Sequence, residues 1–391
     1  MNRDLLKERD RLTFKGHQGP RGLEHLSAEW TALADSMPGA RFVHYPGWYR
    51  AYVSTLESDP SRVWFIGAYR GESLVAVFPL HFQSYTFKGI RPRVFGTIEH
   101  DEMQSCDFVY KRTAENAHLL WEFTQWLRSQ RTIRWDELRL RKVREDSSIA
   151  HSARIRLPKG TITLRHDGSG YFQTGSTYEL AIKGVSGTFR RNLRRLARRA
   201  EESAPLRVQS YRRKDEISQA FDIFLDIEAS GWKGDAGSSS AIRCRPEVLA
   251  FFRAIMAGFS ERDACVINVL WHGDLPVAGQ FCLLIGTTLN ILKIGFSDRH
   301  SSFAPGNLLL ERVIQLACGD EGIEIVSLVN DPGWARNFRP LSLGVYSYCA
   351  PNWTPRGAMV HFGLLAKRAM DARQQDPNET TKTQTDIEVA T

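Results

Sequence analysis

The stretch KIGFSDRHSSFAPGNLLLERVIQLACGDEG, residues 293–322, is the part of the chain from which the fold is most directly predicted. It begins as a strand, continues as a polar loop, and then reads as a helix that starts at Pro305 and Gly306. The first turn of that helix contains no acidic or basic side chain. Because the first N–H groups of a helix lack partners within it and carry partial positive charge, this start predicts a site where the backbone approaches an anion.

Three strand-like segments precede this helix almost without a break, and one comes after it. Tight turns at 272–274 and 286–287 separate the first three, and Gly319 or Gly322 predicts the end of the helix. A meander, a helix and a further strand predict an α+β domain. The segments are ACVINVLWH, LPVAGQFCLLIG, TTLNILKIGFS and IEIVSLV, at 264–272, 275–286, 287–297 and 323–329.

The first half of the chain predicts a second α+β domain on a similar plan. Two helical patterns come first, followed by a hairpin around residues 70–72, a further β region, a helix at 114–130 and a strand at 137–143. A length of 391 residues also exceeds what one hydrophobic core usually supports. We predict two domains, each a mixed and mostly antiparallel sheet flanked by helices, and a polar tail that is disordered. The predicted ranges are 1–165, 166–369 and 370–391.

Composition limits the classes of function. The formal net charge is +8 and the isoelectric point is near 9.2, which favours an anionic partner such as a phosphate-bearing ligand, an acidic membrane surface or a nucleic acid. The six cysteines form no CxxC pair and the histidines no HExxH motif, so we expect reduced thiols and no metal site. The charged first residues lack the apolar core of a secretion signal, and we expect a cytoplasmic protein.

The order of elements resembles that of the GNAT acyltransferase superfamily, and particular motifs narrow the resemblance. They are similar to those of the CelD/BcsL-type acetyltransferases, a group associated with cellulose and exopolysaccharide synthesis and related to the tandem-GNAT FemABX aminoacyltransferases. The resemblance covers roughly residues 25–345. The motifs that carry it are FRRNLRRLARRAEES (189–203), EASGWKG (228–234), LPVAGQF (275–281) and LKIGFSDRHSSFAPGNLLLE (292–311).

This resemblance implies tandem GNAT-like domains and an acyl-CoA donor, with acetyl-CoA the first candidate. The pyrophosphate would lie at the start of the helix, and the strand before it would run beside the pantetheine arm, where a bulge at Gly295 would free an N–H group for the thioester oxygen. An ordinary loop with Pro and Gly as helix punctuation, and a lysine that only caps a strand edge, are the alternatives. The implied donor-binding residues are Lys293, Ile294, Gly295, Ala304, Pro305, Gly306, Asn307 and Leu308.

Acyl transfer to an amine or a hydroxyl group needs a base, commonly a carboxylate. Asp298, Glu228 and Asp331 are the candidates, in that order, and each could instead be a surface carboxylate or a turn cap. The family pattern has Gly-Asp and then Tyr-Lys after the penultimate strand. This chain reads VNDPGWARNFRP there, so Asp331 is kept and the Tyr-Lys pair is missing.

The acceptor side is predicted from three positions. Trp232 and Lys233 lie in a glycine-flanked loop, where the ring could stack on a sugar and the ammonium could bind an anion, or the ring could pin the loop to the core. Gln280 interrupts an apolar strand and needs a hydrogen-bond partner if buried. By resemblance, the segment that contains Asp101 and Asp107 faces the acceptor cleft; the alternative is a strand edge with capping acids.

A predicted helix at 188–203 contains six arginines over a buried apolar stripe. Its basic face is either merely solvated or contacts an anionic substrate, membrane leaflet or RNA. Because the first arginines of this helix often line the site entrance in the family, Arg191 and Arg195 are the residues chosen for substrate contact.

Three functions compete to explain these features. The first is an acyl-CoA-dependent N- or O-acyltransferase that acts by direct attack of a sugar or amine acceptor on the thioester, in exopolysaccharide, cellulose or envelope synthesis. The second is a FemABX-like aminoacyltransferase that uses aminoacyl-tRNA. The third, a nucleic-acid binding protein without catalysis, lacks basic strands interleaved with aromatics. We therefore expect a small-molecule or glycan acceptor, peripheral contact with an anionic membrane or lipid-linked substrate, and no specific nucleic acid.

Overall fold

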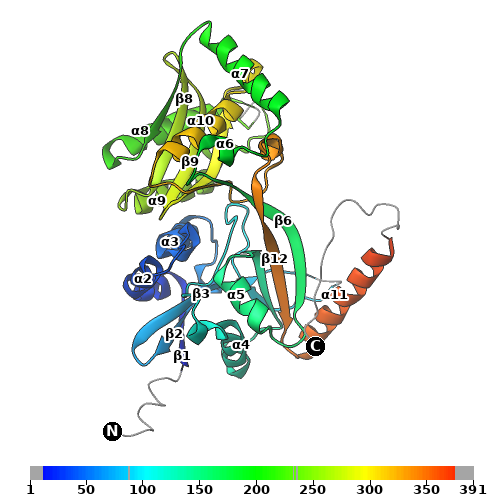
Figure 1. Cartoon of the computed structure of the whole chain (residues 1–391). Helices are drawn as coiled ribbons and strands as arrows, with labels where there is room; N and C mark the ends of the chain where they lie inside the picture. The colour runs from blue at the N-terminus through cyan, green and yellow to red at the C-terminus, as the bar shows by residue number, and fades with distance from the viewer. Residues whose placement is uncertain (1–11, 87–88, 232, 235–236, 375–391) are drawn as a thin grey trace.

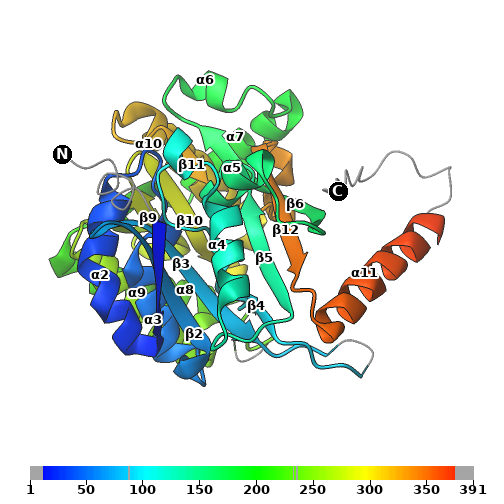
Figure 2. The same ribbon diagram turned by 90° about the horizontal axis from the view of Figure 1, so that it is seen from below.

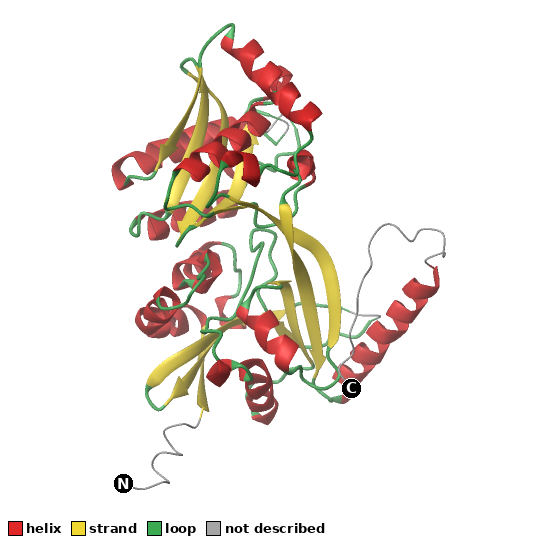
Figure 3. Cartoon of the chain, in the orientation of Figure 1, coloured by secondary structure: helices red, strands yellow, loops and turns green. Residues whose placement is uncertain are grey.

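The computed structural model describes residues 12–86, 89–231, 233–234 and 237–374. These residues form one continuous sheet of twelve strands, ordered β1-β2-β3-β4-β5-β12-β6-β11-β10-β9-β8-β7. Figure 1 shows the long strands β6 and β12 side by side between the two halves. Helices flank the strands in both halves of the molecule (Figure 3). The predicted α+β class, with a mixed sheet flanked by helices in each half, is confirmed, with the difference that the two sheets join edge to edge into one.

The first half begins at one end of this sheet. Its helices contribute apolar faces to the core. The predicted helices, hairpin and strands are present, and the structure adds β1 before them and α5 after them, which the sequence did not predict. In chain order its elements are β1 (Leu12–Gln18), α2 (Gly19–Asp35), α3 (Pro46–Thr55), β2 (Val63–Arg70), β3 (Ser73–Gln83), β4 (Val94–Gly96), α4 (Leu119–Ser129), β5 (Glu137–Arg144) and α5 (Ser148–Ile155).

The second half repeats the same sequence of elements, strand, two helices, three strands, helix and strand, after two helices of its own. The three predicted strands and the helix after them are confirmed, and the helix ends at Gly319 as predicted. The elements are α6 (Tyr178–Ala181), α7 (Gly187–Glu201), β7 (Leu206–Tyr211), α8 (Lys214–Ala229), α9 (Pro246–Ser260), β8 (Cys265–His272), β9 (Leu275–Ile285), β10 (Thr288–Phe296), η5 (Asp298–Phe303), α10 (Pro305–Gly319), β11 (Ile325–Ser327) and η6 (Gly333–Phe338).

Two long strands join the halves. β6 (Ile162–Gln173) pairs with β11, and β12 (Leu341–Pro351) pairs with β6 on one side and with β5 on the other. The predicted boundary at residue 165 lies inside β6, and β12 brings the end of the chain back to the first half. α11 (Pro355–Gln374) then projects from the body of the molecule (Figure 2) and continues past residue 370. The rest of the predicted tail lies outside the described residues.

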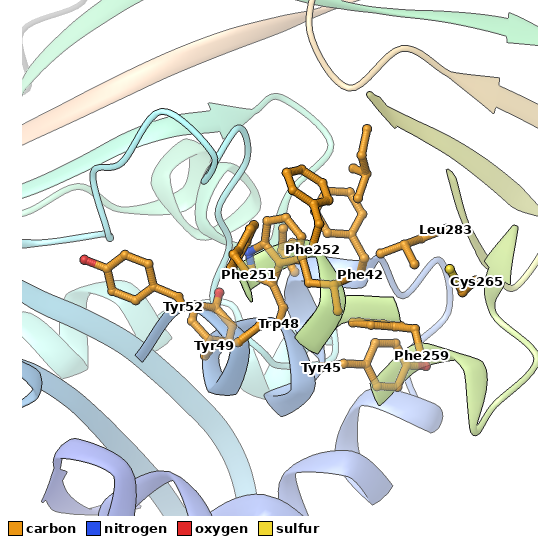
Figure 4. Packing of buried hydrophobic residues seen from close by; sticks show 14 of the residues in the cluster. Phe42, Tyr45, Trp48, Tyr49, Tyr52, Phe251, Phe252, Phe259, Cys265 and Leu283 are labelled. Atoms are coloured by element: carbon orange, nitrogen blue, oxygen red, sulfur yellow. The ribbon is translucent and has the colours of Figure 1, made fainter. Parts of the chain in front are cut away.

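A shared hydrophobic core also connects the halves. α3 of the first half packs against α9 of the second through aromatic rings, with the Trp48 and Phe251 centroids 5.4 Å apart (Figure 4). Phe252 continues this contact to Phe281 on β9, at 5.2 Å between centroids. Tightly packed aromatic pairs bury large apolar areas, so this core holds the second-half sheet and the first-half helices together.

Candidate active site

The strands β10 and β11 diverge at the centre of the second half. They pair in parallel only from Thr288 to Asn290, opposite Ile325 to Ser327. Among the described residues, β10 has no strand partner on this side after Asn290, while β9 continues to pair with it to Phe296 on the other side. The second part of β10 therefore presents an open backbone edge.

A bulge lies at the start of this open edge. The register between β10 and β9 shifts between Ile291 and Lys293, which places the extra residue at Leu292. The prediction of a bulge at Gly295 is wrong, because that residue pairs in register with Gly279. Gly295 serves packing instead: a Cβ atom there would lie 2.7 Å from the Cα of Glu228, so only glycine lets α8 approach the strand this closely.

Lys233 lies on this open edge. The Ser297 N–H donates to the Val277 carbonyl of β9, and since pairing groups alternate along an antiparallel strand, the carbonyl of Ile294 points away from β9. That carbonyl accepts a hydrogen bond from the Lys233 ammonium at 3.0 Å. The ammonium thus reaches into the space between the diverging strands.

Glu228, at the end of α8, lies behind this lysine. Its buried carboxylate accepts the N–H of Ile242 at 2.8 Å through Oε2, and its Oε1 is 3.6 Å from the Lys233 Nζ. Burial lowers the pKa of Lys233; the charge of Glu228 opposes this shift and the nearby charge of Lys293 adds to it. The lysine is therefore easier to deprotonate than an exposed one.

Asp298 lies at the end of the same edge, as the exposed first residue of η5. A Cβ atom on Gly231 would lie 2.9 Å from its carboxyl carbon, so the loop after α8 runs directly against it. The structure thus brings Glu228, Lys233 and Asp298 to one end of β10. Asp331 comes after β11, next to Asn330, whose carbonyl accepts the Gly170 N–H of β6; within the described residues no hydrogen bond or ion pair links Asp331 to the group.

The start of α10 closes this end of the site. Ala304 has a left-handed backbone with φ of 51°, a strained geometry for a residue with a side chain, and no side chain caps the helix. The N–H groups of Asn307 and Leu308 both donate to the Ala304 carbonyl, at 3.0 and 3.1 Å. Pro305 has no N–H, so in the described part of the chain the unpaired amide is that of Gly306. The sequence predicted more free amides than this turn leaves.

A buried carboxylate from the first half reaches the site on the α8 and α9 side of the sheet. Glu102 binds the Lys293 ammonium at 2.9 Å and the Arg245 guanidinium at 3.0 Å, and its own side chain is 2% exposed. The side chain of Lys293 therefore lies on the α8 and α9 side, 5.6 Å from the ring centre of Phe252, and it is occupied by an ion pair. Sequence analysis missed Glu102, since its partners are far away along the chain.

The other residues predicted for the acceptor side do not join the group at the end of β10. Gln280 is buried and accepts a hydrogen bond from Asn268 at 3.3 Å, and Asn268 in turn accepts one from Ser210 at 2.7 Å, so the amide belongs to a polar row across three strands. Trp232 lies outside the described residues. Asp107 is wholly buried in the first half and holds Arg41 and His44, so the prediction that it faces the acceptor is wrong.

The arginine helix is confirmed as α7. Five of its arginines are exposed at the spacing of one helix face, and together with Glu202 they line a cavity of about 580 Å³. Within the described residues none of the five forms an ion pair; Arg191 and Arg195 reach only Thr188 and Asn192 of their own helix. The five are Arg191, Arg194, Arg195, Arg198 and Arg199, and we call them the arginine stripe.

Comparison with known proteins identifies the class of domain that carries this geometry. Residues 187–334 match the family described as acetyltransferase (GNAT) domain. The chain therefore contains a GNAT acetyltransferase domain and is an acyltransferase, and domains of this kind take acyl-CoA donors in general. No protein of curated function matches the sequence.

Solved structures show the same fold over most of the chain. FemX is similar with a TM-score of 0.52 and 10% sequence identity, over 86% of this chain and 98% of that one. L-PGS from Bacillus licheniformis is similar with a TM-score of 0.51 and 13% identity, over 90% of this chain and 98% of that one. At such identities the likeness concerns the fold alone.

Two further features are absent from the described residues. No group of three or more His, Cys, Asp or Glu side chains there is arranged to hold a metal ion. None of the described helices combines the length and the apolar character needed to cross a bilayer.

Proposed function

We propose that the second half transfers an acyl group, first of all acetyl, from coenzyme A to an amine or hydroxyl acceptor. The observation that carries this proposal is the open edge of β10, with a bulge at Leu292 at one end and the uncapped start of α10 at the other. An extended thioester carrier can run along such an edge and place its phosphates at a helix start.

The open edge suggests roles for the individual groups. The Gly306 N–H and the positive end of α10 would hold the pyrophosphate. The bulge leaves a backbone N–H near Leu292 outside the ladder, where it can stabilise the oxygen of the thioester as negative charge develops on it. The acceptor would attack the carbonyl carbon directly, because no serine or cysteine lies in a nucleophile motif.

Two carboxylates compete for the role of base. Asp298 is exposed and lies where an acceptor enters, while Glu228 is buried and held by Ile242 and Lys233. We keep Asp298 as the first candidate, because a base must exchange protons with solvent after each turnover. Asp331 is a weaker candidate, since it lies beyond β11.

Only the sequence resemblance supports a particular class of acceptor. That resemblance favours a sugar or amine in exopolysaccharide, cellulose or envelope synthesis, and none of the comparisons bears on it. The arginine stripe supports an acceptor or a surface with negative charge.

Thermal stabilisation by acetyl-CoA tests the donor proposal, because a ligand that binds only the folded state raises its melting temperature. We expect stabilisation of the wild type and of Gly319→Val, at the far end of α10, where a Cβ atom meets nothing within 4 Å. Gly306→Val should abolish stabilisation by filling the helix start. Equal stabilisation of both variants, or none of the wild type, would contradict the proposal.

The second candidate, an aminoacyltransferase that uses aminoacyl-tRNA, is favoured by the arginine stripe together with the resemblance to FemABX proteins. Gel shifts with tRNA would test it. Salt-sensitive binding that is lost in Arg194→Gln/Arg198→Gln, without any effect of acetyl-CoA on the melting temperature, would favour this candidate over the first.

A further inference from the structure

Lys233 occupies an unusual position for a lysine. Its ammonium is hydrogen bonded to the outward carbonyl of Ile294, on the edge of β10 that no described strand covers. A donor that extends along this edge would use the same outward groups, so its thioester would lie next to the Lys233 nitrogen. This placement rests on the proposed function, because it takes the donor path from there.

The surroundings of Lys233 make its ammonium easier to deprotonate than that of an exposed lysine. Its side chain is 26% exposed, and burial is the main cause of its lowered pKa. The carboxylate of Glu228 is 3.6 Å away and holds the N–H of Ile242 with its other oxygen. A proton acceptor and a partly desolvated amine therefore lie side by side, as in sites where lysine acts as a nucleophile.

Lys293 is a suitable comparison, because it lies near Lys233 but differs in its ion-pair partner and in its position relative to the open edge. Its ammonium pairs with the buried Glu102 on the α8 and α9 side of the sheet, away from the open edge. The two lysines are therefore matched in neighbourhood, while only one of them faces the donor path.

We propose that Lys233 is a site of self-acylation, which takes the acyl group from the bound donor when no acceptor is present. Lys233, whose side chain is 26% exposed, first loses one proton to solvent, and Glu228 accepts the second proton during the attack and returns it to the departing sulfur. The Nζ lone pair then forms an amide bond with the thioester carbon, and the C–S bond breaks with its electron pair on sulfur. The second proton of the nitrogen neutralises the thiolate, so the products are acyl-lysine and free coenzyme A.

The modification would limit the activity of the protein that carries it. Acyl-Lys233 has no charge, so the ion pair with Glu228 is lost, and the amide is too stable to pass the group on. Its acyl group would lie on the open edge of β10, where the next donor must bind. Donor without acceptor would therefore convert the protein slowly into a form that binds donor weakly.

Peptide mass spectrometry tests the proposal without knowledge of the acceptor. The full chain is incubated with acetyl-CoA labelled in the acetyl group, and the label on each lysine is followed over time. We expect Lys233 to be labelled about tenfold faster than Lys293 or more, because a bound donor acts at high effective concentration. Excess coenzyme A should suppress the label on Lys233, whereas the slow label on Lys293 should not respond to it.

Two variants separate a specific site from general reactivity. Lys233→Arg keeps the charge but cannot act as a nucleophile, so it should lose the label and still be stabilised by acetyl-CoA. Glu228→Gln keeps an oxygen for the Ile242 N–H and removes the proton acceptor, so labelling should slow by roughly a hundredfold.

The failures are distinguishable. If acetyl-CoA stabilises the wild type but labels Lys233 no faster than Lys293, or if coenzyme A does not compete, self-acylation at Lys233 is wrong and the proposed donor site stands. If acetyl-CoA neither stabilises the wild type nor labels Lys233 preferentially, the donor site is wrong and the inference falls with it.

Discussion

The two halves of this molecule share one order of elements and differ in the path that the chain takes after the third strand of each meander. In the second half, β10 runs from Thr288 to Phe296, and the chain then leaves for η5 and α10, so the edge stays open. In the first half, the corresponding β4 is only Val94–Gly96. The chain then returns between β3 and β5, where Val109 bridges Val77 and Cys106 bridges Val143. The first half has filled with its own backbone the space that the second half leaves open.

The helices that follow these strands also differ, because only the start of α10 is suited to bind an anion. α10 starts with Pro305 and Gly306 and has no acidic residue in its first turn. α4 starts with buried leucines and has Glu122 in its first turn, where a carboxylate disfavours a second anion. The difference indicates that the same fold can leave space for a ligand or can fill that space with its own chain, depending on a few residues after the third strand.

The largest expected effect concerns the number of donor sites. We expect calorimetry with acetyl-CoA to give one site per chain, with binding abolished by Gly306→Val. As the matched change in the first half, Glu122→Gln removes the acid from the start of α4 and should leave the stoichiometry at one. A second site, or binding that survives Gly306→Val, would break the contrast between the halves.

The next effect concerns the buried carboxylate of the first half. Burial alone would raise the pKa of Asp107, but the hydrogen bond from His44, the charge of Arg41 and backbone N–H groups hold it at about 2. Since an unfolded aspartate titrates near 3.9, about 2–3 kcal/mol of stability should be present above that pH and lost as the pH falls toward 2. Burial lowers the pKa of His44, so its protonation below about 6.5 acts in the same direction.

Denaturant titrations of the wild type and Asp107→Asn across this range would measure the loss. The variant should be less stable at neutral pH by about 3–5 kcal/mol, because it leaves Arg41 buried without its charge partner, and its stability should vary less between pH 4 and 2. Asp274→Asn, in an exposed turn of the second half, is the control and should change the stability at neutral pH by less than about 1 kcal/mol. Parallel pH curves for Asp107→Asn and the wild type would contradict the assignment.

The third prediction concerns the ion pairs that Glu102 of the first half forms with the second half. Glu102→Gln should destabilise the protein by about 2–3 kcal/mol, since it removes the buried charge partner of Lys293 and Arg245, whose own side chains are 20% and 32% exposed. Glu115→Gln, whose carboxylate is 80% exposed in its pair with Arg70, is the matched control and should change stability by less than about 1 kcal/mol. Equal losses of stability in the two variants would show that the ion pairs of Glu102 stabilise the protein no more than an exposed pair does.

The smallest effect is steric. Gly295→Ala adds a methyl group against the backbone of Glu228 and should cost about 1–3 kcal/mol. Gly258→Ala, in α9, meets nothing within 4 Å and should be neutral or stabilising by up to about 1 kcal/mol. Urea unfolding of both variants measures the difference, and a neutral Gly295→Ala would show that α8 moves away easily.

The fold was predictable to a large extent because its elements are locally encoded. The hairpin turns, the alternating strands and the Pro-Gly start of α10 lie within short windows, and each was found where the sequence indicated. The bulge was misplaced from Leu292 to Gly295, because glycine in a strand indicates either a bulge or a close approach, and only the position of α8 distinguishes them.

The candidate site was predictable only in part. Glu228 and Lys233 were predicted from the glycine-containing motif 228–234 and Asp298 from its place just after a strand, and the structure brings the three side by side. No feature of the neighbouring sequence marks Glu102 as a site residue. Asp107 is an acid of the same polar segment, so the sequence does not distinguish the two roles. Which of them is buried inside the first half and which reaches Lys293 depends on the path of residues 97–110 through the sheet.

The sequence by itself therefore determined the order of strands and helices, the basic face of α7 and the backbone chemistry at the start of α10, since each depends on residues within a few turns of one another. Only the tertiary structure decided that β12 returns to bind the halves into one sheet, that the first half fills its own opening, and that Lys233 faces the open edge. These features arise from pairing and packing between distant segments, for which the free energy comes from the whole assembled core and not from any local pattern.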